Sequence, residues 1–218
     1  IKFRRELHSY PETGWCEFVT THKIVEKLRS FGLDPIYGRQ VINPEFVAGR
    51  NPAKVEEAKK AALDKGVPPE FIESMQDYTG VAAIFETGRP GPVLAIRFDM
   101  DCVDVDEAHE AGHRPFDEGW ASTNPGHMHS CGHDGHTTMG IAVCNWIQEN
   151  LDQFCGTIKV VFQPAEEGVR GASAIAASGI VDDADYFLGS HISFMADSGE
   201  IVAAPYGLLC TSKFDVTF

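Results

Sequence analysis

Two kinds of apolar spacing divide the chain into predicted helices and strands. Apolar residues recur at helical spacing over residues 17–31, and this segment ends at Gly32, a plausible helix C-cap. Short apolar runs bounded by Gly and Pro, which are typical of buried strands, occupy residues 81–85 and 93–98. Further helices are expected at residues 3–9, 52–65, 69–75, 136–151 and 171–177, and further strands at 158–162, 186–190 and 200–203.

This alternation of strands and helices predicts an α/β fold with a mostly parallel sheet flanked by helices. Residues 43–78 are interpreted as a helical insertion, because strands resume directly after them. The main unit is expected to span residues 1–210. The tail 211–218 alternates like a strand and stops without a cap or partner, so we expect it to begin a further domain and the chain to be a fragment.

Composition narrows the class of protein. Hydrophobic residues make up 43% of the 218 residues, which is enough for a packed core. The net charge of −14 argues against nucleic acid and anionic membranes as partners. The six cysteines form no C-x-x-C pair, and neither a signal peptide nor an apolar run of transmembrane length occurs, so a reduced, cytoplasmic protein is expected.

The most informative stretch surrounds a single cysteine. Six of the nine histidines fall between His109 and His136, and Cys131 lies among them. A thiolate, several imidazoles and a carboxylate this close together are typical of metal sites. Cys131 and His133 flank Gly132, and side chains two apart in an extended loop point the same way, so both could bind metal and the thiolate could bridge two ions.

Chemically active residues also follow three of the predicted strands. Ligands in open α/β sheets lie beyond the carboxyl ends of the strands, so these residues are expected to meet the cysteine loop at one edge. They are Asp99 and Asp101 after residues 93–98, Glu166 and Glu167 after 158–162, and His191 after 186–190.

The two adjacent glutamates suggest a division of labour. In an extended segment the side chains of Glu166 and Glu167 diverge, so one can bind metal while the other faces the substrate. A free carboxylate beside a metal-bound water is the general base of metallohydrolases. The pattern therefore favours a metal-dependent hydrolase.

Other interpretations remain open. The Glu pair could be a solvated turn, and Asp99 and Asp101 could cap a turn. A cysteine protease would need a histidine far along the chain from Cys131. A structural zinc domain would hold a closed Cys/His set on one loop, which leaves the strand-end residues unexplained. Purely structural roles are expected for Cys16, Cys102, Cys144, Cys155, Cys210, His8, His22, His109 and His113.

Four ordered motifs resemble the amidohydrolase branch of the dinuclear-metal aminoacylase/carboxypeptidase family. The resemblance extends from the Arg4–His8 helix onward and covers essentially the whole chain. The motifs are Arg97–Asp101, Met128–His136, Gln163–Gly168 and the strand-end His191.

The resemblance implies a zinc-peptidase-like catalytic domain, of which residues 1–210 are the N-terminal part. It also implies two divalent ions per complete subunit, Mn²⁺ or Zn²⁺, and a fifth ligand, a histidine, outside this chain. A lid or dimerisation domain would start at residues 211–218 and mediate a homodimer or a heteromer with a related subunit. This fragment is therefore expected to be inactive alone. The implied roles are metal ligation by Cys131, His133, Glu167 and His191, general base catalysis by Glu166, and support from Asp99, Asp101 and Asp134 behind the ligands.

The implied reaction is hydrolysis of an N-acyl or N-aroyl amino acid, a small-molecule partner. Softer cues in residues 43–78, 87–92, 113–115 and 181–187 favour p-aminobenzoyl-glutamate, split to p-aminobenzoate and glutamate in folate catabolism. A hippurate-type hydrolase and an N-acetyl amino acid deacetylase are the enzymatic alternatives. A structural zinc-binding domain is the non-enzymatic one.

Overall fold

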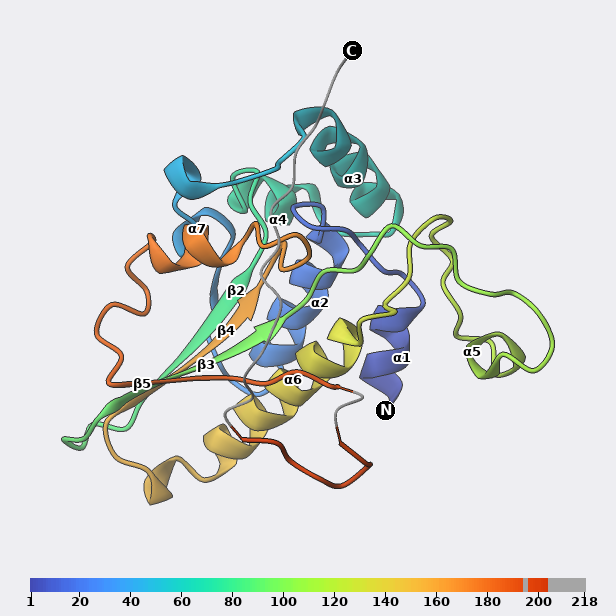
Figure 1. Cartoon of the computed structure of the whole chain (residues 1–218). Helices are drawn as coiled ribbons and strands as arrows, with labels where there is room; N and C mark the ends of the chain where they lie inside the picture. The colour runs from blue at the N-terminus through green and yellow to red at the C-terminus, as the bar shows by residue number, and fades with distance from the viewer. Residues whose placement is uncertain (194–195, 204–218) are drawn as a thin grey trace, which may run out of the picture.

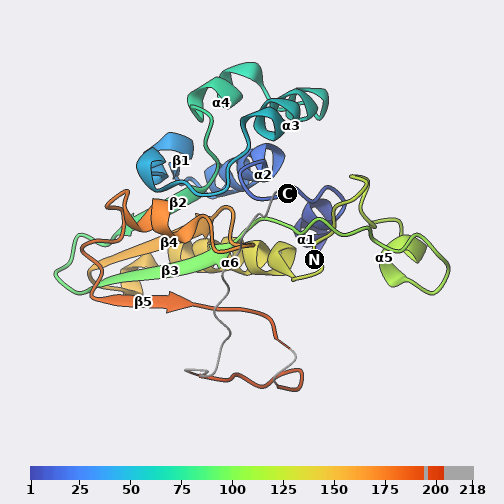
Figure 2. The same ribbon diagram turned by 45° about the horizontal axis from the view of Figure 1, so that its top comes forward.

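The computed structural model describes residues 1–193 and 196–203, and these form an α/β fold around a five-stranded sheet (Figures 1 and 2). The strand order across the sheet is β1-β2-β4-β3-β5. The strands are β1 (Ile36–Tyr37), β2 (Val81–Glu86), β3 (Val93–Asp99), β4 (Thr157–Gln163) and β5 (Tyr186–Gly189).

The predicted α/β class is confirmed, and the sheet is mixed. β3 pairs in parallel with β4 on one side and with β5 on the other. β2 is antiparallel to β4 and to β1, so four strands point one way and β2 points the other. β4 therefore lies between β2 and β3, although β2 and β3 are neighbours in the sequence.

The predicted helices are all present within a few residues. Besides them, a short helix, α5, interrupts the loop after β3, and single 3₁₀ turns occupy Gly38–Val41, Pro44–Phe46 and Leu151–Gln153. The α-helices are α1 (Lys2–His8), α2 (Phe18–Arg29), α3 (Pro52–Asp64), α4 (Pro69–Ser74), α5 (Arg114–Asp117), α6 (His133–Glu149) and α7 (Ala172–Ala176).

Helix α6 packs closely against the middle of the sheet. A Cβ at Gly140 would lie 2.6 Å from the ring of Phe162 on β4 and 2.7 Å from the ring of Phe98 on β3. Both rings are almost fully buried, as is Ile147 further along α6. Because the helix lies this close to the strands, its first turn is held next to their carboxyl ends.

Two sequence-based expectations were wrong. Residues 200–203 form no strand, and Ile201 is 94% exposed, so this segment lacks the pairing and burial that stabilise a strand. Helix α6 begins at His133 rather than at His136, because the left-handed turn at Gly132 starts the helix earlier. The predicted strand at 211–218 lies outside the described residues. Within the described part of the chain, no helix is long and apolar enough to cross a membrane.

Candidate metal centre

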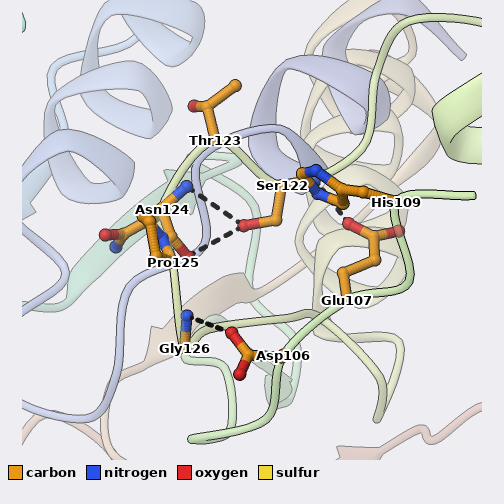
Figure 3. A pocket seen from close by; sticks show the side chains of 8 residues that line it. All are labelled: Asp106, Glu107, His109, Ser122, Thr123, Asn124, Pro125 and Gly126. Carbon is orange, nitrogen blue, oxygen red and sulfur yellow. Dashed lines mark hydrogen bonds between the residues drawn. The ribbon is translucent and has the colours of Figure 1, made fainter.

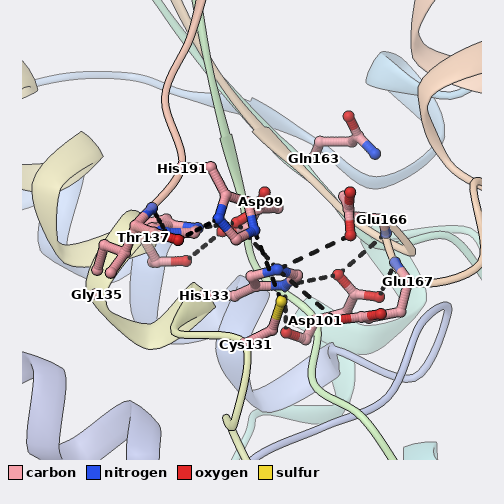
Figure 4. Close-up of polar contacts among 12 residues, drawn as sticks. Asp99, Asp101, Cys131, His133, Gly135, Thr137, Gln163, Glu166, Glu167 and His191 are labelled. Atoms are coloured by element: carbon pink, nitrogen blue, oxygen red, sulfur yellow. Dashed lines mark hydrogen bonds and ion pairs between the residues drawn. The ribbon is translucent and has the colours of Figure 1, made fainter. Parts of the chain in front are cut away.

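Three strand ends bring acidic and imidazole side chains to one edge of the sheet (Figure 4). β3 ends at Asp99, β4 leads into Glu166 and Glu167, and β5 leads into His191. These strands are adjacent and run in the same direction, so their carboxyl ends meet. This is the edge at which open α/β sheets bind ligands.

Cys131 and His133 reach the same edge from the turn that starts α6. Gly132 between them has a φ of +85°, a left-handed conformation that residues with a Cβ rarely adopt. His133 is fully buried, and its Nδ1 lies 2.9 Å from the backbone carbonyl oxygen of Asp101. Since a carbonyl oxygen only accepts, we assign the proton of the neutral ring to Nδ1, which leaves the lone pair on Nε2.

Nε2 of His133 faces two glutamates. It lies 3.8 Å from Oε2 of Glu166 and 3.8 Å from Oε1 of Glu167. One ligand atom each from Cys131, His133 and Glu167 lie within 4.8 Å of one another. Nε2 of His133 and Oε1 of Glu167 are buried without a hydrogen-bond partner in the described part of the chain.

Buried polar atoms almost always have a partner, so these two atoms require an explanation. A divalent cation between them would bind both, and Sγ of Cys131 completes a set of thiolate, imidazole and carboxylate donors. That donor set is suited to zinc or a similar ion. The residues present therefore fit a metal ion.

His191 lies beside this group. Its Nε2 is 3.6 Å from Sγ of Cys131. A second group of potential ligand atoms, again within 4.8 Å of one another, shares His133 with the first and consists of Asp99, His133, His136 and His191. The structure thus brings together all four residues predicted to bind metal.

His136 has a different role from the other histidines of the cluster. Its Nδ1 lies 2.5 Å from Oδ1 of Asp99, and its Nε2 accepts a hydrogen bond from the backbone N–H of Ile192 at 2.8 Å. Both ring nitrogens are therefore occupied. The imidazole ties α6 to the end of β3 and to the segment after β5, which fixes the position of the neighbouring His191.

The electrostatics of His133 show an excess of negative charge at this edge. Burial works to lower the pKa of His133, but a hydrogen bond with Asp101 and the charges of Asp99, Asp101 and Glu166 raise it to about 9. The ring proton then serves as the cation among three carboxylates. A metal ion would take over that neutralising role.

The thiol of Cys131 responds in the opposite sense. Burial, followed by the charge of Glu167, raises the pKa of Cys131 to about 12. Only the thiolate binds metal, so an ion must displace the thiol proton. Acid is therefore expected to weaken metal binding at this position.

Glu166 faces the same space and is held by an arginine. Burial raises the pKa of Glu166, while the charge of His133 acts against the increase. Nη2 of Arg97 lies 3.9 Å from Oε1 of Glu166, and Arg97 also donates to Gln163 and Asp99 at 2.8 and 2.7 Å. A carboxyl group with a raised pKa that is partly open to solvent is suited to accept and return a proton.

Asp101 holds the backbone on which both glutamates lie. Its Oδ1 accepts from the backbone N–H of Glu166 and its Oδ2 from that of Glu167, each at 3.0 Å. Its Oδ1 also lies 3.3 Å from Nδ1 of His133. Asp101 therefore sets the distance between His133 and the glutamate pair.

Asp134 points away from the metal-ligand groups. Its carboxylate accepts from Nε of Arg4 at 3.0 Å and lies 2.9 Å from Nδ1 of His8, so it anchors α1 against the first turn of α6. Nε2 of His8 lies 3.0 Å from Glu107 in the loop after β3. Asp134 thus contacts the helical packing around α6 and not the candidate ligands.

A separate cavity of about 280 Å³ lies in the loop between β3 and α6 (Figure 3). The backbone N–H of Gly126 donates to Asp106 at 2.7 Å, and the hydroxyl of Ser122 donates to the carbonyl oxygen of Asn124 at 3.1 Å. None of the predicted metal ligands lines this cavity. The candidate chemistry is therefore confined to the edge of the sheet.

The interpretation of the sequence assigned no role to two residues that contact this centre, His136 and Arg97. His136 lies three positions after His133, which places both on one face of a helix once the helix starts at His133. Arg97 lies two positions before Asp99, on the same face of β3. Helical and strand spacing within the motifs could therefore have indicated both residues.

Comparison with known proteins reveals clear relatives. The sequence profile described as Peptidase family M20/M25/M40 matches residues 95–213. A Haemophilus influenzae protein, named as a homolog of a p-aminobenzoyl-glutamate hydrolase component, is 49% identical to the chain over 100% of this chain and 52% of that protein. The chain thus spans about half the length of the curated relatives it matches.

Two solved structures share the fold. The aminobenzoyl-glutamate utilization protein of Klebsiella pneumoniae has a TM-score of 0.74 and 34% identity, over 91% of this chain and 44% of that chain. A dinuclear metal-binding peptidase of the M20 family from Bacillus subtilis has a TM-score of 0.65 and 26% identity, over 88% of this chain and 42% of that chain.

Proposed function

Because the chain belongs to peptidase family M20/M25/M40, we propose that it supplies most of the dinuclear metal site of an amidohydrolase. The observation that carries the proposal is the set of ligand atoms from Cys131, His133 and Glu167 within 4.8 Å of one another. Two of its atoms are buried without a hydrogen-bond partner among the described residues.

The proposed ligands are Cys131, His133, Glu167 and His191. When bound, two divalent ions would lower the pKa of a water molecule and polarise the amide carbonyl. The thiolate favours Zn²⁺ and the carboxylate oxygens suit Mn²⁺. The Bacillus subtilis relative is itself described as a dinuclear metal-binding peptidase, which supports a count of two.

Glu166 is the proposed general base. Its carboxylate accepts the proton of the attacking water and later returns it to the leaving amine. Arg97 orients the carboxylate from one side, and Asp101 fixes its backbone. Burial raises the pKa of Glu166, so the protonated form that must return the proton is more accessible than for an exposed glutamate.

The proposed substrate is an N-acyl or N-aroyl amino acid, and p-aminobenzoyl-glutamate is the first candidate. The names of the Haemophilus influenzae and Klebsiella pneumoniae relatives, together with the cues in the insertion, support this choice. The products would be p-aminobenzoate and glutamate. A hippurate-type hydrolase or an N-acetyl amino acid deacetylase would use the same residues.

Paired substitutions test the assignment in the full-length polypeptide that carries these residues. Glu166→Gln is expected to retain bound metal and lose turnover, whereas Glu167→Gln is expected to lose metal affinity as well. Metal content is measured by elemental analysis and turnover by release of the free amine. Near-normal kcat in Glu166→Gln would remove Glu166 as the base.

A substrate panel then distinguishes the activities. p-Aminobenzoyl-glutamate, hippurate, N-acetyl-diaminopimelate and an auxin conjugate are each assayed with Mn²⁺ and with Zn²⁺. The highest kcat/KM is expected for p-aminobenzoyl-glutamate. A higher value for another member would change the substrate while leaving the metal site and the base in place.

A further inference from the structure

The turn that carries Glu166 and Glu167 is held by buried carboxyl groups at three successive backbone amides. The N–H of Ala165 donates to Oε1 of Glu17 at 2.8 Å. The next two amides, of Glu166 and Glu167, donate to the two oxygens of Asp101, each at 3.0 Å. The position of the glutamate pair therefore depends on two acidic residues distant in the sequence.

Ala165 adopts a backbone conformation that needs support. Its φ is +49°, in the left-handed region that residues with a Cβ rarely occupy, and it is fully buried. Such a conformation persists only where the surroundings hold it. The neighbouring backbone fits closely, since a Cβ at Gly14 would lie 2.8 Å from Cα of Ala165.

Glu17 is well placed to provide that support. It is fully buried at the N-terminus of α2, and its Oε2 accepts from the hydroxyl of Thr79, just before β2, at 2.6 Å. The side chain is thus anchored on two elements of the fold and reaches the turn after β4 from a fixed base. Burial, with a smaller contribution from the charge of Asp101, raises the pKa of Glu17 to about 8.

Neither ionisation state of Glu17 prevents this contact, because a carboxyl oxygen accepts a hydrogen bond whether the group is charged or neutral. What the contact requires is an oxygen at the right distance. A side chain of the same length with a carbonyl oxygen preserves it, and a side chain one methylene shorter does not.

We propose that Glu17 is a positioning residue that fixes the turn at Ala165 and thereby aims the carboxylate of Glu166 at the reacting water. The inference rests on the proposed role of Glu166. It extends the functional unit to a residue near the start of the chain, where no metal ligand has been proposed.

Two substitutions separate reach from charge. Glu17→Gln keeps the reach and loses the charge: its amide oxygen accepts from Ala165, and its amide nitrogen donates to Thr79. Glu17→Asp keeps the charge and loses the reach. In the full-length polypeptide, we expect Glu17→Gln to keep kcat and Glu17→Asp to lower it about 10- to 100-fold with KM unchanged, because a 1 Å misplacement costs about this much.

Glu12 provides the matched control. It is also a buried carboxyl group at the start of α2, and it accepts from the backbone N–H groups of Val19 and Thr20 at 3.0 and 2.7 Å. These bonds hold α2 and not the turn at Ala165. Glu12→Asp should therefore lower the melting temperature about as much as Glu17→Asp while kcat stays unchanged.

Three results would overturn the proposal: kcat at least as high in Glu17→Asp as in Glu17→Gln, an equal loss of kcat in Glu12→Asp, or losses that merely follow the folded fraction. If Glu17→Asp does not fold, Thr79 offers a second comparison. Thr79→Val removes the hydroxyl that anchors Glu17 and should lower kcat, whereas Thr79→Ser should not; equal kcat in both would contradict the proposal.

The Glu166→Gln variant keeps this test separate from the proposed function. If Glu166→Gln retains turnover, the assignment of the base fails. If Glu166→Gln is inactive but the expected ranking of the Glu17 variants is absent, only the positioning role fails.

Discussion

Replacing Gly171 with alanine should displace the turn that carries the glutamate pair. Gly171 lies just before α7 with φ −92° and ψ −30°, a conformation that alanine adopts without strain. The space is the obstacle, because an added Cβ would lie 1.8 Å from the carbonyl oxygen of Pro164. Gly171 also donates its backbone N–H to the carbonyl oxygen of Ala165 at 2.8 Å.

The size of the effect follows from that distance. Since Cβ atoms essentially never approach other atoms within 3.0 Å, the two atoms must separate by at least 1.2 Å, the difference between 3.0 and 1.8 Å. Overpacking costs about 1–3 kcal/mol, and replacing Gly by Ala returns about 0.4–1 kcal/mol through the unfolded chain. Because the obstructing atoms are backbone, we expect a net destabilisation of about 2 kcal/mol.

Urea unfolding of residues 1–218, followed by circular dichroism, measures this difference. Gly189→Ala is the matched control, because a Cβ there would have no described atom within 4 Å, and it should change stability by less than about 0.5 kcal/mol. In the full-length polypeptide, the shifted turn should also lower kcat by about 100-fold. Equal stability of Gly171→Ala and Gly189→Ala would refute the close approach on which this reasoning depends.

Two further predictions concern metal binding and pH. Cys131→Ala should lower the bound metal per chain, and acid should release metal from the unmodified protein, because the pKa of the Cys131 thiol is raised to about 12 and a proton competes with the ion; unchanged stoichiometry would exclude Cys131 as a ligand. Burial raises the pKa of Glu12 from 4.5 to about 7, so the stability that it contributes is present below pH 4.5 and is lost as the pH rises through about 7. The free energy of unfolding of Glu12→Gln, relative to the unmodified chain, should therefore increase between pH 4.5 and 7 in urea titrations, and a difference independent of pH would contradict the raised pKa.

Local patterns in the sequence were sufficient to predict most of the elements. The helical spacing over residues 17–31 corresponds to α2, and the apolar runs at 93–98 and 158–162 correspond to β3 and β4. These predictions succeed because a helix or a buried strand repeats its apolar positions within a few residues. The close spacing of Cys131 and His133 likewise marked the candidate metal ligands without knowledge of the fold.

Pairing between distant segments was decided by the tertiary structure. Nothing in the runs at 81–85 and 93–98 shows that β4 lies between them or that β2 runs against its neighbours. A strand in a sheet covered on both faces has the same apolar pattern whichever neighbour it pairs with. The predicted strand at 200–203 shows the converse, since β-like residues form no strand there without a partner.

The same limit applies to the candidate centre. The sequence alone indicated which residue types gather at the strand ends, because strand ends can be read locally. It could not show that His136 bonds to Asp99, or that Glu17 holds the amide of Ala165 from 148 positions away. Those contacts exist because the sheet order and the packing of α2 and α6 bring distant segments within hydrogen-bonding distance, and no local periodicity encodes that proximity.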